Sequence, residues 1–167
     1  IVKDEEALDA VTVTYGYRSF HVDPNTGFHL NGKRVPLHGV SRHQDRWGVG
    51  NALTMEHHRR DMEIIREMGC NTLRLAHYQH AQEFYNLCDE YGMVVWAEIP
   101  YITMHMTNGS ANTLSQMEEL VVQNYHHPSI VVRGLSNEIT MGGAKDPDLL
   151  RNHRVLNDMV HQMDKTR

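Results

Sequence analysis

Asn137-Glu138 is the pair of residues in this chain whose chemistry best suits acid–base catalysis. It follows an apolar stretch that ends in Gly134-Leu135-Ser136. A carboxyl group at the end of such a strand is partly shielded from water, and shielding favours the protonated form that a general acid requires. The structural alternative is a glutamate at a helix N-terminus, satisfied by backbone N–H groups. Position alone gives the two interpretations equal weight.

Arg74 is the second candidate, because it stands within an otherwise apolar stretch. A guanidinium in such surroundings must be paired. Its partner can be a catalytic carboxylate that it keeps ionised, or it can form an ordinary buried ion pair with Glu98 or Asp89. The sequence leaves both possibilities open.

Further polar and aromatic candidates follow other predicted strands. An imidazole at His43 or His77 can hydrogen-bond a sugar hydroxyl or a carboxylate, although a single histidine is more often structural. Glu98 can orient a substrate, bind a metal with a neighbour, or pair with Arg74. Tyr101 can stack on the face of a sugar, as can Trp96, which suits a protein core equally well.

The elements that must position these residues alternate regularly between strand and helix. Apolar strands are predicted at 35–40, 71–76, 93–97 and 129–132, and helices at 55–68, 82–91, 114–125 and 147–163. Thr54 and Asp146 are suitable N-caps, and Gly69 and Gly92 are suitable residues just past a helix end. Apolar strands that alternate with helices indicate a parallel sheet covered by helices.

Two folds have this element order, a doubly wound sheet and a (β/α)8 barrel. The turn at 39–45 lacks the glycine pattern that a dinucleotide-binding sheet carries after its first strand. The polar candidates instead collect after each strand, where a barrel builds its site. We therefore predict an α/β fold that is the first half of a (β/α)8 TIM barrel. The complete fold needs about 250 residues.

The first 34 residues have a different pattern. Residues 11–17 alternate between apolar and small or polar side chains, which predicts a strand with one buried face. Residues 23–27 form a turn cluster, and Asn31-Gly32 predicts a hairpin. We expect residues 1–34 to be a β-rich lead-in and residues 35–167 to be the first four βα units.

Composition narrows the range of partners. The chain has 167 residues, 40% hydrophobic and 22% charged, with a formal net charge of −5. These values are typical of a soluble globular protein, and there is no basic block for nucleic acid or cationic face for a membrane surface. Residues 1–6 have no signal-peptide pattern, so cytoplasmic and periplasmic locations both stay open.

Two separated stretches resemble the signatures of glycoside hydrolase family 2, the β-galactosidase and β-glucuronidase family. Residues 71–79, NTLRLAHYQ, resemble the family's motif of Asn-x-x-Arg followed by two small residues and then His-Tyr-Pro. Here Leu75 replaces one of the small residues, and Gln79 replaces the proline. Residues 127–138, HPSIVVRGLSNE, resemble the family's His-Pro-Ser to Asn-Glu stretch, with Arg133 for the usual Trp. The likeness extends to residues 28–43, similar to the family's passage from a preceding β-sandwich into the barrel, and to residues 87–100.

The resemblance implies retaining hydrolysis of terminal β-glycosidic bonds, with β-galactosidase as the best single expectation. It implies that Glu138 is the acid/base and that Asn137 bonds the sugar 2-hydroxyl. It also implies that Arg74 supports the nucleophile. The expected substrate-binding set is Asn137, His43, His77, Arg74, Glu98 and Tyr101.

The resemblance also bears on metal and partners. Residues 99–105 lack the Glu-x-His pattern of the family's Mg²⁺ ligands, so we expect no cofactor. The family's nucleophile is a glutamate on the seventh strand, whereas residues 164–167 resemble the end of the fourth helix. We expect the partners to be a β-glycoside substrate, the rest of the barrel and flanking sandwich domains. The isolated 167 residues should self-associate and be inactive.

Other functions remain compatible with the sequence. A non-catalytic carbohydrate-binding or structural half-barrel would have the same fold. Other barrel glycosidases, such as a β-glucuronidase, a β-mannosidase or a family 5-like glucanase, would have similar chemistry. The glucanase carries Asn-Glu after its fourth strand but would not have the sandwich-like stretch at 15–40.

Overall fold

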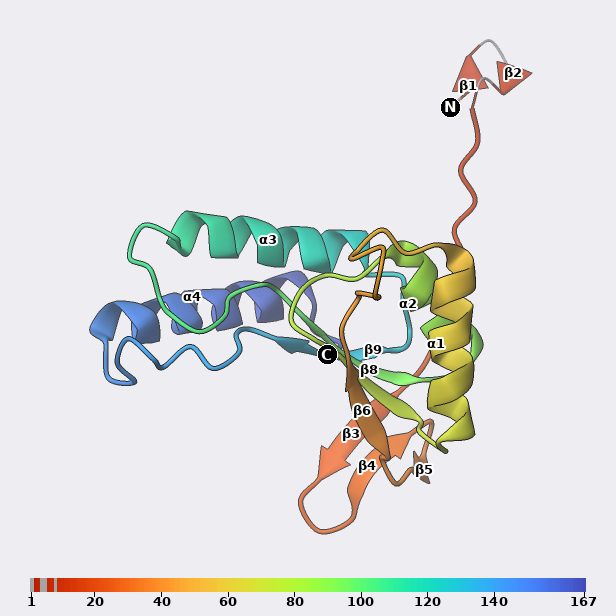
Figure 1. The fold of residues 1–167 in the computed structure, drawn as a ribbon, viewed down its shortest axis with the longest axis horizontal. Coiled ribbons are helices and arrows are strands. Elements are labelled where there is room, and N and C mark those ends of the chain that lie inside the picture. The colour runs from red at the N-terminus through yellow and green to blue at the C-terminus, as the bar shows by residue number, and fades with distance from the viewer. Residues whose placement is uncertain (1, 4–5, 8) are drawn as a thin grey trace.

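A parallel sheet organises the computed structural model, which describes residues 2–3, 6–7 and 9–167. Its strands are β6 (Gly39–Arg42), β7 (Thr72–Leu75), β8 (Val94–Glu98) and β9 (Ile130–Gly134), in that order across the sheet. The helices that follow them are α1 (Met55–Glu67), α2 (Gln82–Glu90), α3 (Ser110–Gln123) and α4 (Pro147–Met163). Neighbouring helices pack in pairs, α1 with α2 and α3 with α4 (Figure 1). The sequential order of parallel strands confirms four βα units of a barrel and excludes a sheet whose order reverses.

The main core lies between the sheet and the helices. Successive strand side chains point to opposite faces, so Leu73 and Leu75 are fully buried toward the helices while Arg74 points to the other face. Val95 and Ala97 of β8 continue the same buried layer. The helices contribute Met62, Phe84, Met117, Leu120 and Leu156. Full burial of each large apolar side chain contributes roughly 1.5–3 kcal/mol, which makes this layer the rigid support of the opposite face.

The helix ends follow the predicted capping residues. The Asp146 side chain accepts a hydrogen bond from the Asp148 backbone N–H at 2.8 Å, with Pro147 in the first turn. The Thr54 backbone N–H donates to His57 Nδ1 at 3.1 Å. Gly69 has a φ of 76°, in the left-handed region that a glycine after a helix favours. Within the described residues, no helix is both long and apolar enough to cross a membrane.

A small antiparallel sheet precedes the barrel strands. It consists of β3 (Phe20–Asp23), β4 (Gly27–Leu30) and β5 (Lys33–Arg34), and it confirms both the turn at 23–27 and the hairpin at 31–33. Phe28 is buried against Val94 and Val131, at the amino ends of β8 and β9. This sheet therefore lies at the end of the barrel strands opposite their carboxyl ends (Figure 1). A short antiparallel pair, β1 (Val2–Lys3) with β2 (Glu6–Ala7), lies nearer the N-terminus.

The predicted strand at 11–17 is wrong. Residues 9–19 are not assigned to a strand, and the four residues expected to form a buried face are exposed, with Tyr17 at 89%. Alternation predicts a strand only when a partner edge and a core are available. No strand of the described chain pairs with this segment, and regular β structure begins at Phe20.

The first barrel strand begins later than predicted, at Gly39 instead of Val35. Pro36 has no N–H to donate to a ladder. Its carbonyl accepts a hydrogen bond from the Asn71 side chain, whose oxygen accepts from the His38 N–H. The Asn71 side chain thus fixes residues 36–38 as the connection between the small antiparallel sheet and the first barrel strand. In addition, α3 begins at Ser110, four residues before the first apolar position that signalled it.

Candidate active site

Four side chains meet at the carboxyl ends of β7, β8 and β9. Arg74 Nε donates to Glu98 Oε1 at 2.5 Å, and Arg74 Nη2 donates to Asn137 Oδ1 at 2.7 Å. His77 Nδ1 lies 2.9 Å from Glu98 Oε2. We call Arg74, His77, Glu98 and Asn137 the strand-end network.

Glu98 is the centre of the strand-end network. Its side chain is 1% exposed, and each of its oxygens contacts one cationic or imidazole partner. Arg74 is in register with Trp96 across β7 and β8, so Glu98, two residues further on, projects from the same face. A buried carboxylate must be paired, and this pairing settles which partner Arg74 takes. Asp89, the other candidate, instead contacts His127 at 2.6 Å.

The hydrogen bonds also assign the tautomer of His77. Nδ1 lies 2.9 Å from the Glu98 carboxylate and 3.2 Å from Arg74 Nη2. A carboxylate accepts only, so Nδ1 carries the proton and donates to Glu98, and its approach to Arg74 is a contact. His77 Nε2 is then the ring nitrogen left to hydrogen-bond another group. His43, which is exposed, lies beside it with ring centroids 5.1 Å apart.

Asn137 and Glu138 lie in the loop after β9. The Asn137 N–H donates to the Tyr101 carbonyl at 2.9 Å, and the Thr103 N–H donates to the Asn137 carbonyl at 3.0 Å. Glu138 has a φ of 49°, an uncommon left-handed conformation for a residue that is not glycine. Its side chain is exposed, so the shielding predicted for it is wrong within this structure, because the elements described around β9 leave that side open.

Trp96 and Gly134 lie next to the strand-end network. The Trp96 side chain is 43% exposed, and the Arg74 guanidinium carbon lies 5.9 Å from its ring centroid. A Cβ on Gly134 would contact the Trp96 indole nitrogen and come within 2.8 Å of Glu98 Cγ. Glycine is therefore required here by close approach, and Trp96 belongs to the open face rather than to the core.

The structure places Tyr101 away from the role expected for it. Its ring is 6% exposed and belongs to the main core. Its hydroxyl lies 2.5 Å from His105 Nδ1, and burial raises the pKa of this phenol. A ring buried in this way is not available to stack on a sugar, so the expectation that Tyr101 binds substrate is corrected.

A buried cluster behind the site was missed at the level of sequence. Arg42, at the end of β6, donates to Asp61 at 2.7 Å and to His80 Nδ1 at 3.0 Å, and approaches His58. His80 lies 3.1 Å from the Ala76 carbonyl, directly before His77. Burial lowers the pKa of His80 to about 3, so it stays neutral and keeps one tautomer. Sequence reasoning missed Arg42 because it fell in the turn expected at 39–45, just after the predicted strand at 35–40, whereas the structure places it at the end of β6.

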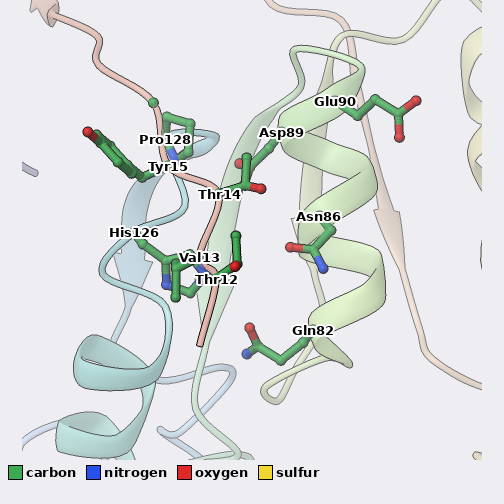
Figure 2. Close-up of a pocket in the computed structure, with 11 residues that line it drawn as sticks. Thr12, Val13, Thr14, Tyr15, Gln82, Asn86, Asp89, Glu90, His126 and Pro128 are labelled. Carbon is green, nitrogen blue, oxygen red and sulfur yellow. The ribbon is translucent and has the colours of Figure 1, made fainter. Parts of the chain in front are cut away.

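Two further observations concern ligands. Among the described residues, no group of three or more His, Cys, Asp or Glu side chains is placed to hold a metal ion. A cleft of about 700 Å³ lies between residues 12–16 and α2, lined also by His126 and Pro128 (Figure 2). No member of the strand-end network lines it, so it is separate from the candidate site.

Comparisons with known proteins match the barrel fold described above. The family described as "Glycosyl hydrolases family 2, TIM barrel domain" matches residues 22–167. A β-glucuronidase of Bacteroides fragilis is 44% identical over 99% of this chain and 25% of its own length. A β-galactosidase of Thermoanaerobacterium thermosulfurigenes is 31% identical over 92% of this chain and 21% of its own.

A solved structure has a similar fold. The crystal structure of an FMN-binding β-glucuronidase from Faecalibacterium prausnitzii L2-6 is 49% identical, with a TM-score of 0.87. The match covers 92% of this chain and 24% of that one. The chain thus spans about a quarter of the length of the proteins it matches.

Proposed function

The chain belongs to glycoside hydrolase family 2, and on this premise we propose that it supplies the acid/base half of a retaining β-glycosidase site. The observation that carries the proposal is the strand-end network, in which Arg74, His77, Glu98 and Asn137 meet beside Glu138. Carboxyl ends of barrel strands are where barrel enzymes build their sites. Residues 35–167 are then four units of the catalytic barrel, and residues 1–34 lead into it.

Glu138 acts as the acid and then as the base. In the first step it donates a proton to the glycosidic oxygen while a second carboxylate attacks the anomeric carbon, and the C–O bond breaks. In the second step its carboxylate takes a proton from the water that displaces the enzyme from the sugar. Its exposure on the open side of β9 supports this role, because a bound glycoside can reach an exposed carboxyl group.

Glu98 is not that second carboxylate. Retaining enzymes need a nucleophile about 5–5.5 Å from the acid/base, with an oxygen free to attack. Both oxygens of Glu98 are committed, to Arg74 and to His77, and its side chain is 1% exposed. Glu98 therefore supports Arg74, and the nucleophile belongs to the part of the barrel outside these four units.

The remaining polar groups bind the sugar. Because the Asn137 oxygen accepts from Arg74, its amide N–H groups are left to donate to a hydroxyl. His77 Nε2 and the neighbouring His43 supply further hydrogen-bonding positions. This arrangement supports a substrate rich in hydroxyl groups, as a terminal sugar is.

Among possible sugars, a β-glucuronide is favoured over a β-galactoside. The relatives at 44% and 38% identity are named β-glucuronidase or putative β-glucuronidase, and the β-galactosidase reported above is 31% identical. The comparison of kcat/KM for an aryl β-glucuronide and an aryl β-galactoside, using the protein that contains the complete barrel, decides between them. A clear preference for the galactoside would reverse this assignment.

The acid/base role is tested with Glu138→Gln in the same complete protein. The variant should impair turnover of a natural disaccharide substrate more than that of a substrate with an activated aryl leaving group, which needs less protonation. The product anomer, followed by NMR, should show retention. Glu118→Gln, an exposed carboxylate on α3, is the matched control. Unchanged disaccharide turnover in Glu138→Gln would refute the role. Sugar binding without any turnover by the unsubstituted protein would favour a non-catalytic binding module.

The isolated 167 residues should behave differently from the complete protein. β6 and β9 are the outer strands of the parallel sheet, and Trp96 and Val132 are partly exposed at 43% and 37%. Unpaired strand edges next to exposed apolar side chains invite pairing with another copy. We expect association on size-exclusion chromatography with light scattering and no glycosidase activity. A stable monomer would contradict the first expectation.

A further inference from the structure

We propose that Tyr101, His105 and Asp148 form a latch that positions the loop carrying Asn137 and Glu138. The inference rests on the proposed function and names positioning residues for it. None of the three needs to touch the substrate. They connect the loop after β8 to the first turn of α4. The loop after β8 in turn contacts the loop that carries Asn137 and Glu138, which we call the acid/base loop.

The latch is a continuous chain of hydrogen bonds. Tyr101 Oη lies 2.5 Å from His105 Nδ1, and His105 Nε2 lies 2.9 Å from Asp148 Oδ2. The Asp148 carboxylate can only accept, so Nε2 carries the proton and Nδ1 accepts from the tyrosine hydroxyl. In this arrangement the Tyr101 hydroxyl, both ring nitrogens of His105 and Asp148 Oδ2 each have a hydrogen-bond partner. The side chain of His105 is 3% exposed, and that of Asp148 is 21% exposed.

Burial of Tyr101 and the hydrogen bond from His105 to Asp148 keep the protons of the latch in these positions. Burial raises the pKa of Tyr101, so the hydroxyl keeps its proton and continues to donate. The hydrogen bond from His105 holds the pKa of Asp148 below its ordinary value, so the carboxylate continues to accept. The directions of donation are therefore fixed at both ends.

Backbone hydrogen bonds join the loop after β8 to the acid/base loop. The Tyr101 carbonyl accepts from the Asn137 N–H, and the Asn137 carbonyl accepts from the Thr103 N–H. The Thr103 carbonyl then accepts from the Met141 N–H at 3.3 Å. These bonds bracket Glu138 on both sides in sequence, so the path of its backbone depends on where residues 101–104 lie.

Both loops contain a residue in the left-handed region. Thr103 has a φ of 69° and Glu138 a φ of 49°. Such conformations are unfavourable for residues other than glycine, and they persist only where the surroundings determine them. The backbone ladder and the latch supply those surroundings. A loosened latch lets both residues relax, and the relaxation moves the Glu138 carboxyl group away from the glycosidic oxygen.

His153 of α4 makes a second connection between this helix and the two loops. His153 of α4 lies 2.7 Å from Ser136 Oγ, immediately before the Asn137-Glu138 pair, and its ring lies 5.4 Å from the Tyr101 ring. Helix α4 is thus attached to both loops. Its first turn holds the β8 loop through Asp148, and its second holds the end of β9.

The test uses Tyr101→Phe in the protein that contains the complete barrel, with Tyr91→Phe as the matched control. Tyr91 is exposed at 41% on the outside, at the end of α2. A misplaced acid should lower kcat/KM for a disaccharide by about tenfold or more, within the range that general acid catalysis contributes. It should lower kcat/KM for a substrate with an activated aryl leaving group much less. A purely structural defect would lower both by the same factor.

A second variant keeps the proposal testable if Tyr101→Phe folds poorly. The amide of His105→Gln can accept from Tyr101 and donate to Asp148, so it should retain more disaccharide activity than His105→Ala. Equal losses on the two substrates, or equal activities of the two His105 variants, would overturn the latch. Glu138→Gln is measured alongside, and an absence of leaving-group dependence in that variant would instead overturn the proposed function itself.

Discussion

The side-chain oxygen of Asn137 accepts a hydrogen bond from Arg74 at 2.7 Å, although 63 positions separate the two residues. The same guanidinium holds Glu98 through Nε. One cation therefore ties a buried carboxylate to the amide beside Glu138, and orients that amide so that its N–H groups point elsewhere.

Asn137→Asp separates the two functions of the amide. The aspartate keeps an oxygen for Arg74 but has no N–H to donate to a sugar hydroxyl. We expect kcat/KM to fall about 10- to 100-fold, the equivalent of one strong hydrogen bond to substrate, with little change in melting temperature. Asn157→Asp, on the exposed side of α4, is the control. Full activity in Asn137→Asp would exclude the donor role.

Glu98→Gln should destabilise the protein. It leaves the Arg74 guanidinium without its charge partner on the inner face of the sheet. We expect a loss of roughly 2–3 kcal/mol in the free energy of unfolding, less than the roughly 3–5 kcal/mol of a fully buried pair. The loss is smaller because 34% of the Arg74 side chain is exposed.

Urea denaturation measures that loss, and Glu63→Gln provides the comparison. Glu63 pairs with Arg60 on the surface of α1, where the side chains are 59% and 51% exposed. Such a pair contributes about 0–1 kcal/mol, so this variant should change little. Similar effects of the two substitutions would show that Glu98 is not a structural anchor.

His80 should make stability depend on pH. Burial lowers the pKa of the folded protein's His80 to about 3, whereas the ordinary value is 6.5. The unfolded chain therefore takes up a proton first, and the contribution of His80 to stability is present above pH 6.5 and lost as pH falls toward 3. The slope is about 1.4 kcal/mol per pH unit within that window.

His80→Gln removes this dependence. The glutamine amide can still donate to the Ala76 carbonyl, but it does not titrate in this range. Between about pH 7 and pH 5 the variant should lose less stability than the unsubstituted protein, as followed by denaturation at each pH. Parallel pH profiles for the two proteins would contradict the assignment of a neutral, buried His80.

Gly134→Ala should disturb the site without touching the acid/base. The added Cβ would meet the Trp96 indole nitrogen and lie 2.8 Å from Glu98 Cγ, so one of the two side chains must move. We expect lower kcat/KM and a changed tryptophan fluorescence spectrum. Gly142→Ala, where the nearest Cβ contact is 3.4 Å from Met104, is the milder comparison. An unaltered spectrum together with unaltered kinetics would show that the close approach has no consequence.

The sequence alone determined those elements whose signals are local. Helix α4 has the predicted bounds, because Asp146, Pro147 and the apolar spacing act within a few residues of one another. The hairpin at 31–33 follows in the same way, whereas the order of the strands follows from the alternation of strands and helices along the chain. The strand expected at 11–17 failed, because pairing depends on an edge that local alternation does not describe.

The sequence predicted part of the candidate site, and the tertiary structure decided the rest. A charge within an apolar stretch identified Arg74. Position after a strand identified His77, Glu98 and Asn137, because parallel strands bring their carboxyl ends to one edge. Sequence could not choose between Glu98 and Asp89 as the partner of Arg74. The tertiary structure chose Glu98, since the alternation of β7 and β8 puts both side chains on one face, while Asp89 on α2 contacts His127. It also buried Tyr101 and built the latch, because contacts between loops 30 or more residues apart exist only once the barrel strands have brought them together.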